Sequence, residues 1–563
     1  MTTQSNLVDC GEGVQLERGV TAIMRDGIKL VSDHYYPFGT GSFPTLLMRQ
    51  PYGRAIASTV VYAHPVWFAR AGYHVVIQDV RGRGDSQGDF YPFRNEGADG
   101  FDTLSWLANH PACNGKIGMY GFSYQGMTQW LAAAEQPPGL VAIAPWMTAH
   151  DLYEGWFYHQ GTLRLADTIG WGIQMLREDA RRRQLKSVSA ELEAAWLQPR
   201  QQAYFTPYGE LPVLAHKGLP SYLCDWIEHR SRDDYWKQLD IADRLGSVRL
   251  PALHLSGWYD PYLRGSITGF RALSTAGVPH QYLLAGPWVH IPFGDRVGDM
   301  SLGEHAQFDT NQLLLRWFNH WLKGTNDFSE EPVVRHFVLG ANSWRESESW
   351  GGDQIQTYFL RSAGSANSRK GDGTLTVTHP HTSEPRDWFV QDPETPVIAP
   401  GGPTASPGSF DQAGTEQGNN VLVYTSEPLA EDCSVFGAPL LTLYATSSAE
   451  TTDFVGKLVR VRPDQKCEFI CIGVARSDWL FAESYRADHI QEWKFELEPT
   501  SCQFNKGDRI RLEIASSAFP LYDRNPGVKI AASKASPWNW KRSTQSILHE
   551  PQYPSKIELP VTT

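Results

Sequence analysis

The chain lacks the features that take a protein into or across a membrane. No stretch approaches the roughly 18 uninterrupted apolar residues that a spanning helix needs. Residues 1–13 contain neither a basic segment nor an apolar core, so they do not resemble a secretory signal. We therefore expect a cytoplasmic protein that has no membrane partner.

Cysteine and positive charge are also scarce. The 7 cysteines are scattered and form no C-x-x-C pair, which is typical of reduced thiols. The motif H-E-x-x-H is absent, and His379 and His381 form an isolated pair, so we expect neither a metal nor a cofactor. The net charge of −12 at pH 7 gives no electrostatic reason to expect nucleic acid as a partner.

The chain is, by contrast, long and rich in aromatic residues. A chain of 563 residues is too long for one domain, because domains average about 150 residues. Aromatic residues make up 12% of the chain and include 20 tryptophans. Most of these rings must pack in cores, but the excess favours a ligand site with aromatic walls.

The first part of the chain alternates strands and helices. This rhythm predicts an α/β domain with a mainly parallel sheet, whose strands are apolar on both faces. We expect strands at 45–49, 73–78, 117–120, 141–146, 252–256 and 281–285, and helices at 97–110 and 311–322.

The rhythm breaks twice. Between 149 and 245 strand candidates vanish and Arg/Glu-rich helical sequence takes over, which predicts a helical cap over the ends of the strands. From 351 onward the sequence is β throughout. Residues 509–514 alternate apolar and charged side chains, which predicts one buried face and one wet face. We favour a jelly-roll sandwich for this part.

These patterns predict three domains. Residues 1–148 and 246–350 would form a discontinuous α/β-hydrolase domain, 149–245 its helical cap, and 351–563 an all-β jelly-roll domain. The longest loop, 396–420, suits either a flexible linker or a segment folded over a site. The sequence leaves open whether the chain forms a homo-oligomer.

A candidate nucleophile lies after the short apolar run 117–120. Gly121, Ser123 and Gly126 precede good helix formers, which is the pattern of a serine at a tight turn between a strand and a helix. Gln125 occupies the second glycine position of the strict G-x-S-x-G motif, and Gly126 comes one residue later. Taken alone, the motif is evenly balanced between a nucleophile elbow and a chance arrangement.

A serine hydroxyl needs a base and an acid to become a nucleophile at neutral pH. In α/β-hydrolases they follow in the order Ser, Asp or Glu, His, each after a later strand. Asp260 follows the strand that starts at 252, and His290 follows the next strand. Either residue alone would more often be structural, but their order and context favour Ser123, Asp260 and His290 as a catalytic triad.

An oxyanion formed at Ser123 would need hydrogen-bond donors. The backbone N–H of Tyr124, directly after the nucleophile, is the expected first donor. The second donor should come from the loop after an early strand, where Tyr52 lies. The residues alone leave the Tyr52 hydroxyl evenly divided between this role and simple packing.

Several strings resemble the cocaine esterase (CocE/NonD) family of serine hydrolases, which is related to X-prolyl dipeptidyl peptidases and α-amino acid ester hydrolases. The resemblance runs along nearly the whole chain and is specific. It rests on P-Y at 51–52, D-V-R-G-R-G at 79–84, G-F-S-Y-Q-G at 121–126, S-G-W-Y-D at 256–260, G-P-W-V-H at 286–290, L-G-A-N-S-W-R at 339–345, T-D-F-V-G-K-L at 452–458 and S-S-A-F-P-L-Y-D-R-N at 516–525.

The resemblance implies the same three-part architecture, with the active site where the parts meet. It also implies Ser123, Asp260 and His290 as the triad and Tyr52 with Tyr124 as the oxyanion pair. Aromatic acyl-pocket residues of the family are matched in this chain by three residues, Trp156, Trp171 and Tyr262. A small-molecule ester with a bulky or aromatic acyl group is the substrate that this match implies.

Departures from the family pattern limit that inference. Pro261 follows the acid where a glycine is usual, and the 396–420 loop lacks an expected apolar pair. The related amino acid ester hydrolases bind an ammonium group with an acid beside the catalytic Asp, and Pro261 cannot do this.

The leading hypothesis is a serine carboxylesterase. Amide or peptide hydrolysis of the X-prolyl or β-lactam acylase type remains an alternative, and a catalytically silent binding protein is a third.

Overall fold

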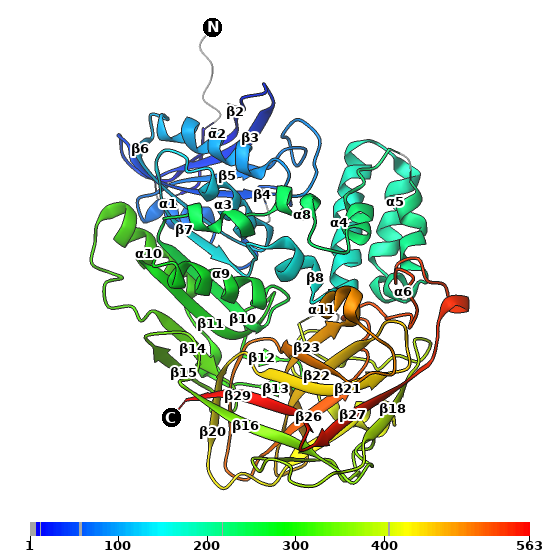
Figure 1. Cartoon of the computed structure of the whole chain (residues 1–563). Coiled ribbons are helices and arrows are strands. Elements are labelled where there is room, and N and C mark those ends of the chain that lie inside the picture. The colour runs from blue at the N-terminus through cyan, green and yellow to red at the C-terminus, as the bar shows by residue number, and fades with distance from the viewer. Residues whose placement is uncertain (1–6, 12, 56–58, 217, 404–405, 563) are drawn as a thin grey trace.

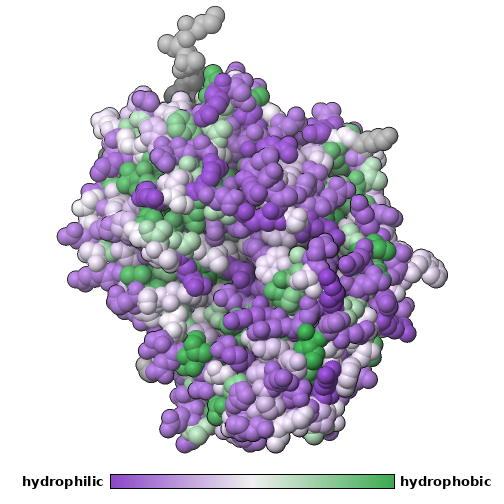
Figure 2. Space-filling model, in the orientation of Figure 1, coloured by the Kyte–Doolittle hydropathy of each residue, from purple (hydrophilic) through white to green (hydrophobic). Residues whose placement is uncertain are grey.

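The computed structural model describes residues 7–11, 13–55, 59–216, 218–403 and 406–562. It contains two large sheets, the first surrounded by helices and the second formed by the C-terminal part of the chain (Figure 1). The face drawn in Figure 2 is largely hydrophilic, with apolar residues in separate patches. Within the described ranges, no helix is both long enough and apolar enough to cross a membrane. All seven cysteines are free thiols.

The first sheet has its strands in the order β1-β2-β3-β5-β4-β6-β7-β10-β11-β14-β15. Neighbours from β5 to β14 run parallel, and the pairs at both ends of the sheet are antiparallel. The strands are β1 (Leu7–Asp9), β2 (Gln15–Ile23), β3 (Lys29–Tyr36), β4 (Phe43–Gln50), β5 (His74–Asp79), β6 (Cys113–Phe122), β7 (Leu140–Trp146), β10 (Ala252–Tyr259), β11 (Gln281–Val289), β14 (Val334–Val338) and β15 (Ser343–Ser347). The six predicted strands are all confirmed.

Helices cover both faces of this sheet, so its strands alternate between two cores. In β4, Leu47 packs into the core on the side of α2 and α3, whereas Leu46 and Met48 pack with residues of α1 and α10. Apolar residues on both strand faces are therefore required here. The helices are α1 (Pro65–Arg70), α2 (Glu96–Ala108), α3 (Tyr124–Ala134), α9 (Leu263–Thr275) and α10 (Thr310–Phe318), the last continued by a π-turn (Asn319–Lys323).

The segment between β7 and β10 is mainly helical, as predicted. The helical sequence splits into two helices because Gln184 has a positive φ of 57°, which breaks the helix there. One feature was not predicted, a two-stranded hairpin formed by β8 (Tyr158–His159) and β9 (Thr162–Leu163). The helices are a π-turn (Tyr153–Phe157), α4 (Leu165–Arg182), α5 (Lys186–Trp196), α6 (Pro199–Tyr204), α7 (Tyr222–Glu228) and α8 (Asp234–Leu239).

The second sheet has 14 strands and begins with β16. An α/β domain followed by a separate all-β domain is thus confirmed. The strands are β16 (Gln354–Arg361), β17 (Thr374–Thr376), β18 (Asp387–Gln391), β19 (Leu422–Ser426), β20 (Cys433–Gly437), β21 (Leu440–Ser447), β22 (Asp453–Val461), β23 (Cys467–Arg476), β24 (Gln491–Glu496), β25 (Thr500–Phe504), β26 (Arg509–Ala515), β27 (Ser543–Glu550), β28 (Tyr553–Pro554) and β29 (Lys556–Thr562), with the short helix α11 (Ser477–Leu480) after β23. Two further two-residue strands, β12 (Arg296–Val297) and β13 (Met300–Ser301), pair outside both sheets.

The predicted wet face of β26 is wrong. Ile510, Leu512 and Ile514 are buried as expected, but Arg511 and Glu513 on the opposite face are buried too. The loop around the 3₁₀ turn Gln412–Gln417 covers that face, and both charges have ion partners. Arg511 Nη1 lies 2.6 Å from Glu416 of this turn, and Lys457 Nζ of the neighbouring strand β22 lies 2.7 Å from Glu513. Paired charges can be buried, so alternating polarity did not mean exposure.

Candidate active site

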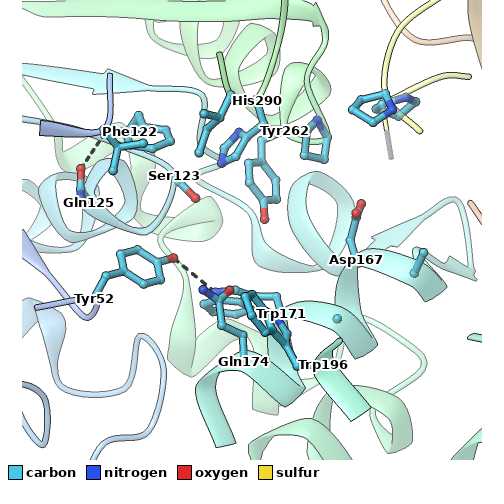
Figure 3. A pocket seen from close by; sticks show the side chains of 17 residues that line it. Tyr52, Phe122, Ser123, Gln125, Asp167, Trp171, Gln174, Trp196, Tyr262 and His290 are labelled. Atoms are coloured by element: carbon cyan, nitrogen blue, oxygen red, sulfur yellow. Dashed lines mark hydrogen bonds between the residues drawn. The ribbon is translucent and has the colours of Figure 1, made fainter. Parts of the chain in front are cut away.

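A cavity of about 530 Å³ opens at the carboxyl edge of the first sheet, against α4 and α5 (Figure 3). Most of its wall is aromatic or aliphatic. The lining residues are Tyr52, Val60, Phe122, Ser123, Gln125, Ala166, Asp167, Gly170, Trp171, Gln174, Trp196, Pro261, Tyr262, His290, Ile291, Pro403 and Pro407. Five of the eight residues predicted for the triad, the oxyanion hole and the acyl pocket therefore line one cavity: Ser123, His290, Tyr52, Trp171 and Tyr262.

Ser123 lies at a tight turn between β6 and α3. Its φ of 61° is in the left-handed region, which is strained for a non-glycine residue and typical of a nucleophile elbow. The two glycines allow the turn to close: a Cβ on Gly121 would lie 2.4 Å from the Gln125 side chain, and one on Gly126 would lie 2.6 Å from Thr148. Glycine is thus needed one position later than in the strict motif because Thr148 approaches there.

Asp260 and His290 follow neighbouring parallel strands. Tyr259 at the end of β10 pairs with Val289 at the end of β11, so the next residues on the two strands lie side by side. The Asp260 carboxylate accepts a hydrogen bond from His290 Nδ1 at 2.5 Å and another from the backbone N–H of Tyr262 at 2.7 Å. The Asp260 side chain is fully buried, whereas His290 reaches the cavity. This arrangement leaves Nε2 of His290 free to act as a base toward Ser123, which it faces in Figure 3.

Tyr52 follows β4 and places its hydroxyl in the cavity. The Trp171 indole N–H donates to this hydroxyl at 3.2 Å. Because an indole N–H can only donate, the Tyr52 oxygen is the acceptor in that bond and its own proton is free for another acceptor. Burial raises the pKa of Tyr52 to about 12, against the opposing effect of hydrogen bonds with Trp171 and Ser123, so the hydroxyl stays protonated at neutral pH. It is therefore chemically suited to donate to an oxyanion.

Tyr124 is the first residue of α3, where a backbone N–H has no partner within the helix. Its buried side chain fixes the start of the helix, since its hydroxyl donates to Glu96 at 2.7 Å and accepts from the Phe93 N–H at 3.1 Å. The N–H of Tyr124 is thus held beside Ser123.

The three predicted acyl-pocket residues occupy different positions relative to the cavity. Trp171 and Tyr262 line it. Trp156 is absent from the lining and stacks on Tyr262 with ring centroids 4.0 Å apart, so it supports the wall from behind. Tyr262 in turn packs edge-on against the His290 ring at 5.2 Å.

Sequence reasoning missed several lining residues. Asp167, Gln174 and Trp196 belong to helices whose sequence carries no signal of a site; only the spacing of Asp167, Trp171 and Gln174 along one helix face could have grouped them. Pro403 and Pro407 show that the 396–420 loop reaches the cavity rather than serving as a remote linker. Residues 404 and 405 of that loop lie outside the described residues.

Remote parts of the chain hold α4 in place against the site. Its first two N–H groups, of Leu165 and Ala166, donate to the carbonyls of Leu521 and Pro520 in the all-β domain at 3.1 and 3.2 Å. Farther along the helix, Asp179 binds the buried Arg83 of the loop after β5 at 2.7 Å. The wall of the cavity therefore depends on contacts between segments far apart in the sequence.

Comparison with known families and proteins agrees with this geometry. The family described as X-Pro dipeptidyl-peptidase (S15 family) matches residues 26–292, and the X-Pro dipeptidyl-peptidase C-terminal non-catalytic domain matches residues 326–558. Cocaine esterase of Rhodococcus sp. (strain MB1 Bresler) is 33% identical over 561 residues, which cover 96% of this chain and 97% of the relative.

Solved structures share the whole fold. An α-amino acid ester hydrolase superposes with a TM-score of 0.81 at 23% identity, covering 98% of this chain and 97% of the other. An aminopeptidase from the marine sediment archaeon Thaumarchaeota archaeon gives a TM-score of 0.79 at 24% identity, covering 97% and 96%. At these identities the likeness establishes the fold of both domains.

Proposed function

Because the chain belongs to the cocaine esterase (CocE/NonD) family of hydrolases, we propose that it is a serine carboxylesterase that acts through an acyl-enzyme. The observation that carries this proposal is the shared cavity. The strained Ser123, the ring of His290 and the hydroxyl of Tyr52 all line one aromatic space, and Asp260 binds His290 from behind it.

In the proposed acylation step, Ser123 Oγ attacks the ester carbonyl while His290 Nε2 takes the serine proton. Asp260 holds the imidazole in the tautomer that accepts at Nε2 and stabilises the imidazolium that forms. The Tyr52 hydroxyl and the Tyr124 N–H donate to the carbonyl oxygen as it gains charge. The imidazolium then protonates the leaving alkoxide, so the alcohol departs and the acyl group stays on Ser123.

Deacylation repeats these steps with water. His290 takes a proton from water, the resulting hydroxide attacks the acyl-enzyme, and the same two donors hold the second oxyanion. Collapse of this intermediate expels Ser123 Oγ, which regains its proton from His290. The carboxylic acid is released and the residues return to their starting protonation states.

The residues that line the cavity indicate the size of the acyl group that it can hold. Trp171 and Tyr262, supported by Trp156, give a broad aromatic surface that suits a bulky or aromatic acyl group. We further propose that 149–245 acts as a helical cap on the discontinuous hydrolase domain of 1–148 and 246–350. In the same proposal 351–563 is a jelly roll, and the protein works in the cytoplasm.

Amide or peptide hydrolysis is a second candidate, which the match to the S15 peptidase family favours. The two reactions share every residue named above and differ in the leaving group, since an amine must be protonated before it departs. A panel of aryl esters and X-Pro amides separates them: we expect kcat/KM to be highest on the aryl esters, and a preference for X-Pro amides would overturn the assignment.

The proposal depends on Ser123. We expect a fluorophosphonate to label the protein at this residue, and Ser123→Ala to lose labelling together with about 10⁶-fold in kcat while keeping its thermal midpoint. The matched control is Ser105→Ala, on α2, where the hydroxyl donates to the Phe101 carbonyl of the same helix. This variant should be labelled and active like the parent. Unchanged turnover in Ser123→Ala, or a parent protein that does not label, would favour the catalytically silent alternative.

A further inference from the structure

One buried ion pair connects the two proposed oxyanion donors and has no part in the mechanism above. Arg49 of β4 and Glu96 of α2 have side chains that are 0% and 3% exposed, and Arg49 Nη1 lies 2.9 Å from the Glu96 carboxyl. Tyr52 follows Arg49 by three residues, and the Tyr124 hydroxyl donates to Glu96 at 2.7 Å. The pair is therefore joined to one donor through the chain and to the other through a hydrogen bond.

The Tyr124 side chain is held from two sides. Its hydroxyl donates to Glu96 and accepts from the backbone N–H of Phe93 at 3.1 Å. Burial and the neighbouring Glu96 raise the pKa of this phenol well above its usual value, so it keeps its proton and remains a donor at neutral pH. Because Tyr124 is the first residue of α3, fixing its side chain also fixes the backbone N–H that we assign to the oxyanion.

The residue that binds Tyr124 from the other side is strained. Phe93 has a φ of 70°, in the left-handed region that bulky residues rarely adopt. Its ring stacks on the Tyr124 ring with centroids 4.8 Å apart and meets Trp156 edge-on at 5.2 Å. Strain of this kind persists only where the surrounding structure enforces it, and it clusters at functional sites. Here the strained residue joins the start of α3 to the support of the cavity wall.

Arg49 also ties β4 directly to the two helices. Its carbonyl accepts a hydrogen bond from the Thr128 hydroxyl of α3 at 3.3 Å, and its Nη1 donates to the backbone carbonyl of Glu96 in α2 at 3.1 Å. The strand that leads to Tyr52 and the helix that begins with Tyr124 are thus fixed relative to each other through one residue.

We propose that Phe93, Glu96 and Arg49 are positioning residues for the oxyanion hole, and that they act together through the hydroxyl of Tyr124. The inference rests on the proposed esterase function. Donors stabilise an oxyanion best when they already point at the place where charge develops, because reorganising them during the reaction costs part of that stabilisation. A chain of contacts that fixes both donors before the substrate arrives meets this requirement.

A purely structural role of this chain predicts a different result. Removing a buried hydroxyl anywhere in the fold lowers stability, since its partner is left unsatisfied. Removing a positioning contact also weakens binding of the tetrahedral state, while binding of the planar ester is unchanged. An inhibitor that mimics the tetrahedral state therefore separates the two roles.

The experiment compares Tyr124→Phe, which keeps the ring and the backbone N–H, with the parent. The readouts are steady-state hydrolysis of a neutral aryl ester and inhibition by phenylboronic acid. In the boronate adduct Ser123 Oγ bonds to boron, His290 takes the serine proton, and a boron-bound oxygen occupies the position of the oxyanion. We expect kcat to fall at least tenfold, affinity for phenylboronic acid to fall by a similar factor, and KM to change by less than threefold.

The matched control is Tyr158→Phe, which removes a buried hydroxyl that donates to the Trp226 carbonyl at 2.9 Å, away from the described cavity lining. It should lose stability as Tyr124→Phe does and keep kcat and boronate affinity within twofold of the parent. A fall in kcat of less than tenfold in Tyr124→Phe, a kcat loss without a matching loss of boronate affinity, or an equal kcat loss in Tyr158→Phe would overturn the proposal.

A double-mutant cycle tests whether the residues act as one chain. Arg49→Met should also lower kcat, and adding Tyr124→Phe to it should cost less than threefold more, because the chain is already broken. If Arg49→Met does not fold, the cycle is measured with Glu96→Gln, which keeps the side-chain volume. Additive losses would overturn the shared role. Failure of the esterase function is separate, since it would appear as a parent protein that neither labels at Ser123 nor cleaves the aryl ester.

Discussion

The catalytic edge of the first sheet and the wall of the cavity are built in opposite ways. Ser123, Asp260 and His290 each come directly after a strand, and the pairing of β10 with β11 sets two of them side by side. The wall comes from α4, α5 and a loop of the all-β domain, which are held by contacts between remote segments. Local strand geometry therefore positions the proposed catalytic residues, and long-range packing positions the residues of the cavity wall.

This difference predicts that substitutions in the two regions have different effects on turnover, stability and substrate binding. Changes at the edge should reduce kcat without loosening the fold, because strands buried on both faces hold those residues. Changes at the supports of the wall should reduce stability and substrate binding, since contacts with remote segments hold α4 in place.

The largest effect is expected from Asp260→Asn. An amide at this position can present its N–H to His290 Nδ1, which favours the wrong tautomer and removes the charge that stabilises the imidazolium. We expect kcat to fall about 10⁴-fold on an aryl ester, with KM within a few-fold of the parent. Steady-state kinetics measure kcat and KM, and a thermal melt checks that the fold is not loosened. A fall of less than tenfold would mean that His290 is oriented by another group.

Tyr52→Phe should have a smaller effect of the same kind. The variant keeps the ring and loses the hydroxyl that would donate to the oxyanion, so we expect kcat to fall about 10² to 10³-fold with little change in KM. Tyr36→Phe is the control, because its hydroxyl bonds Glu17 on a neighbouring strand away from the cavity. If KM rose and kcat held, Tyr52 would be part of the wall and not of the catalytic edge.

The wall is tested by Arg83→Met. Arg83 is fully buried and holds Asp179 of α4, so its removal leaves a buried carboxylate whose remaining partner among the described residues is the Tyr222 hydroxyl. We expect a loss of about 3–5 kcal/mol in the free energy of unfolding and a KM about tenfold higher, with kcat within about threefold. Chemical denaturation and kinetics at saturating ester measure these changes.

The matched control for that variant is Arg25→Met, which breaks an ion pair between the exposed Arg25 side chain and Asp102. Exposed pairs contribute about 1 kcal/mol or less, so its stability and kinetics should stay close to those of the parent. Equal destabilisation in the two variants, or a kcat loss in Arg83→Met comparable with that of Asp260→Asn, would contradict the division between edge and wall.

The same division explains how much the sequence could predict. Chain order and strand ends were enough to propose Ser123, Asp260 and His290, because the carboxyl ends of parallel strands converge at one edge. The α/β and all-β parts were predictable for a similar reason, since hydrophobic periodicity is a local property of the sequence. The sequence pattern also contained Gly121 and Gly126, but the need for glycine becomes clear only once Gln125 is seen beside the first and Thr148 beside the second.

Side chains positioned by remote contacts could not be predicted in this way. Asp167 enters the cavity because Leu521 and Pro520 accept the first N–H groups of α4, and no local pattern encodes that pairing. Trp156 illustrates the converse, since its type suits a pocket but Tyr262 stands between it and the cavity. Arg511 and Glu513 were misassigned to a wet face because the covering loop lies about 95 residues away from Arg511 in sequence.

The stability of the sheet that supports the catalytic edge should depend on pH separately from the chemistry at the edge. His34 of β3 and His74 of β5 are buried. Their rings are hydrogen-bonded to each other at 2.9 Å, and their other ring nitrogens bond the hydroxyls of Ser32 and Thr45. Burial lowers the pKa of His34 well below its usual range and that of His74 to about 3. Below pH 6.5 the unfolded chain therefore binds protons that the folded protein does not, so stability is full above pH 6.5 and is lost as the pH falls toward 3.

The smallest expected change at neutral pH, His74→Gln, tests this directly. Glutamine can keep a hydrogen bond to each neighbour but cannot take a proton, so the thermal midpoint should fall less steeply between pH 6 and 4 than in the parent. Turnover at pH 8 should stay within about twofold, because the cluster lies away from the cavity. The exposed His489→Gln is the control and should keep the parent's acid dependence. If His74→Gln changed the pH dependence of kcat and left the melting curves unaltered, the edge would be coupled to the sheet beneath it, and the division drawn here would fail.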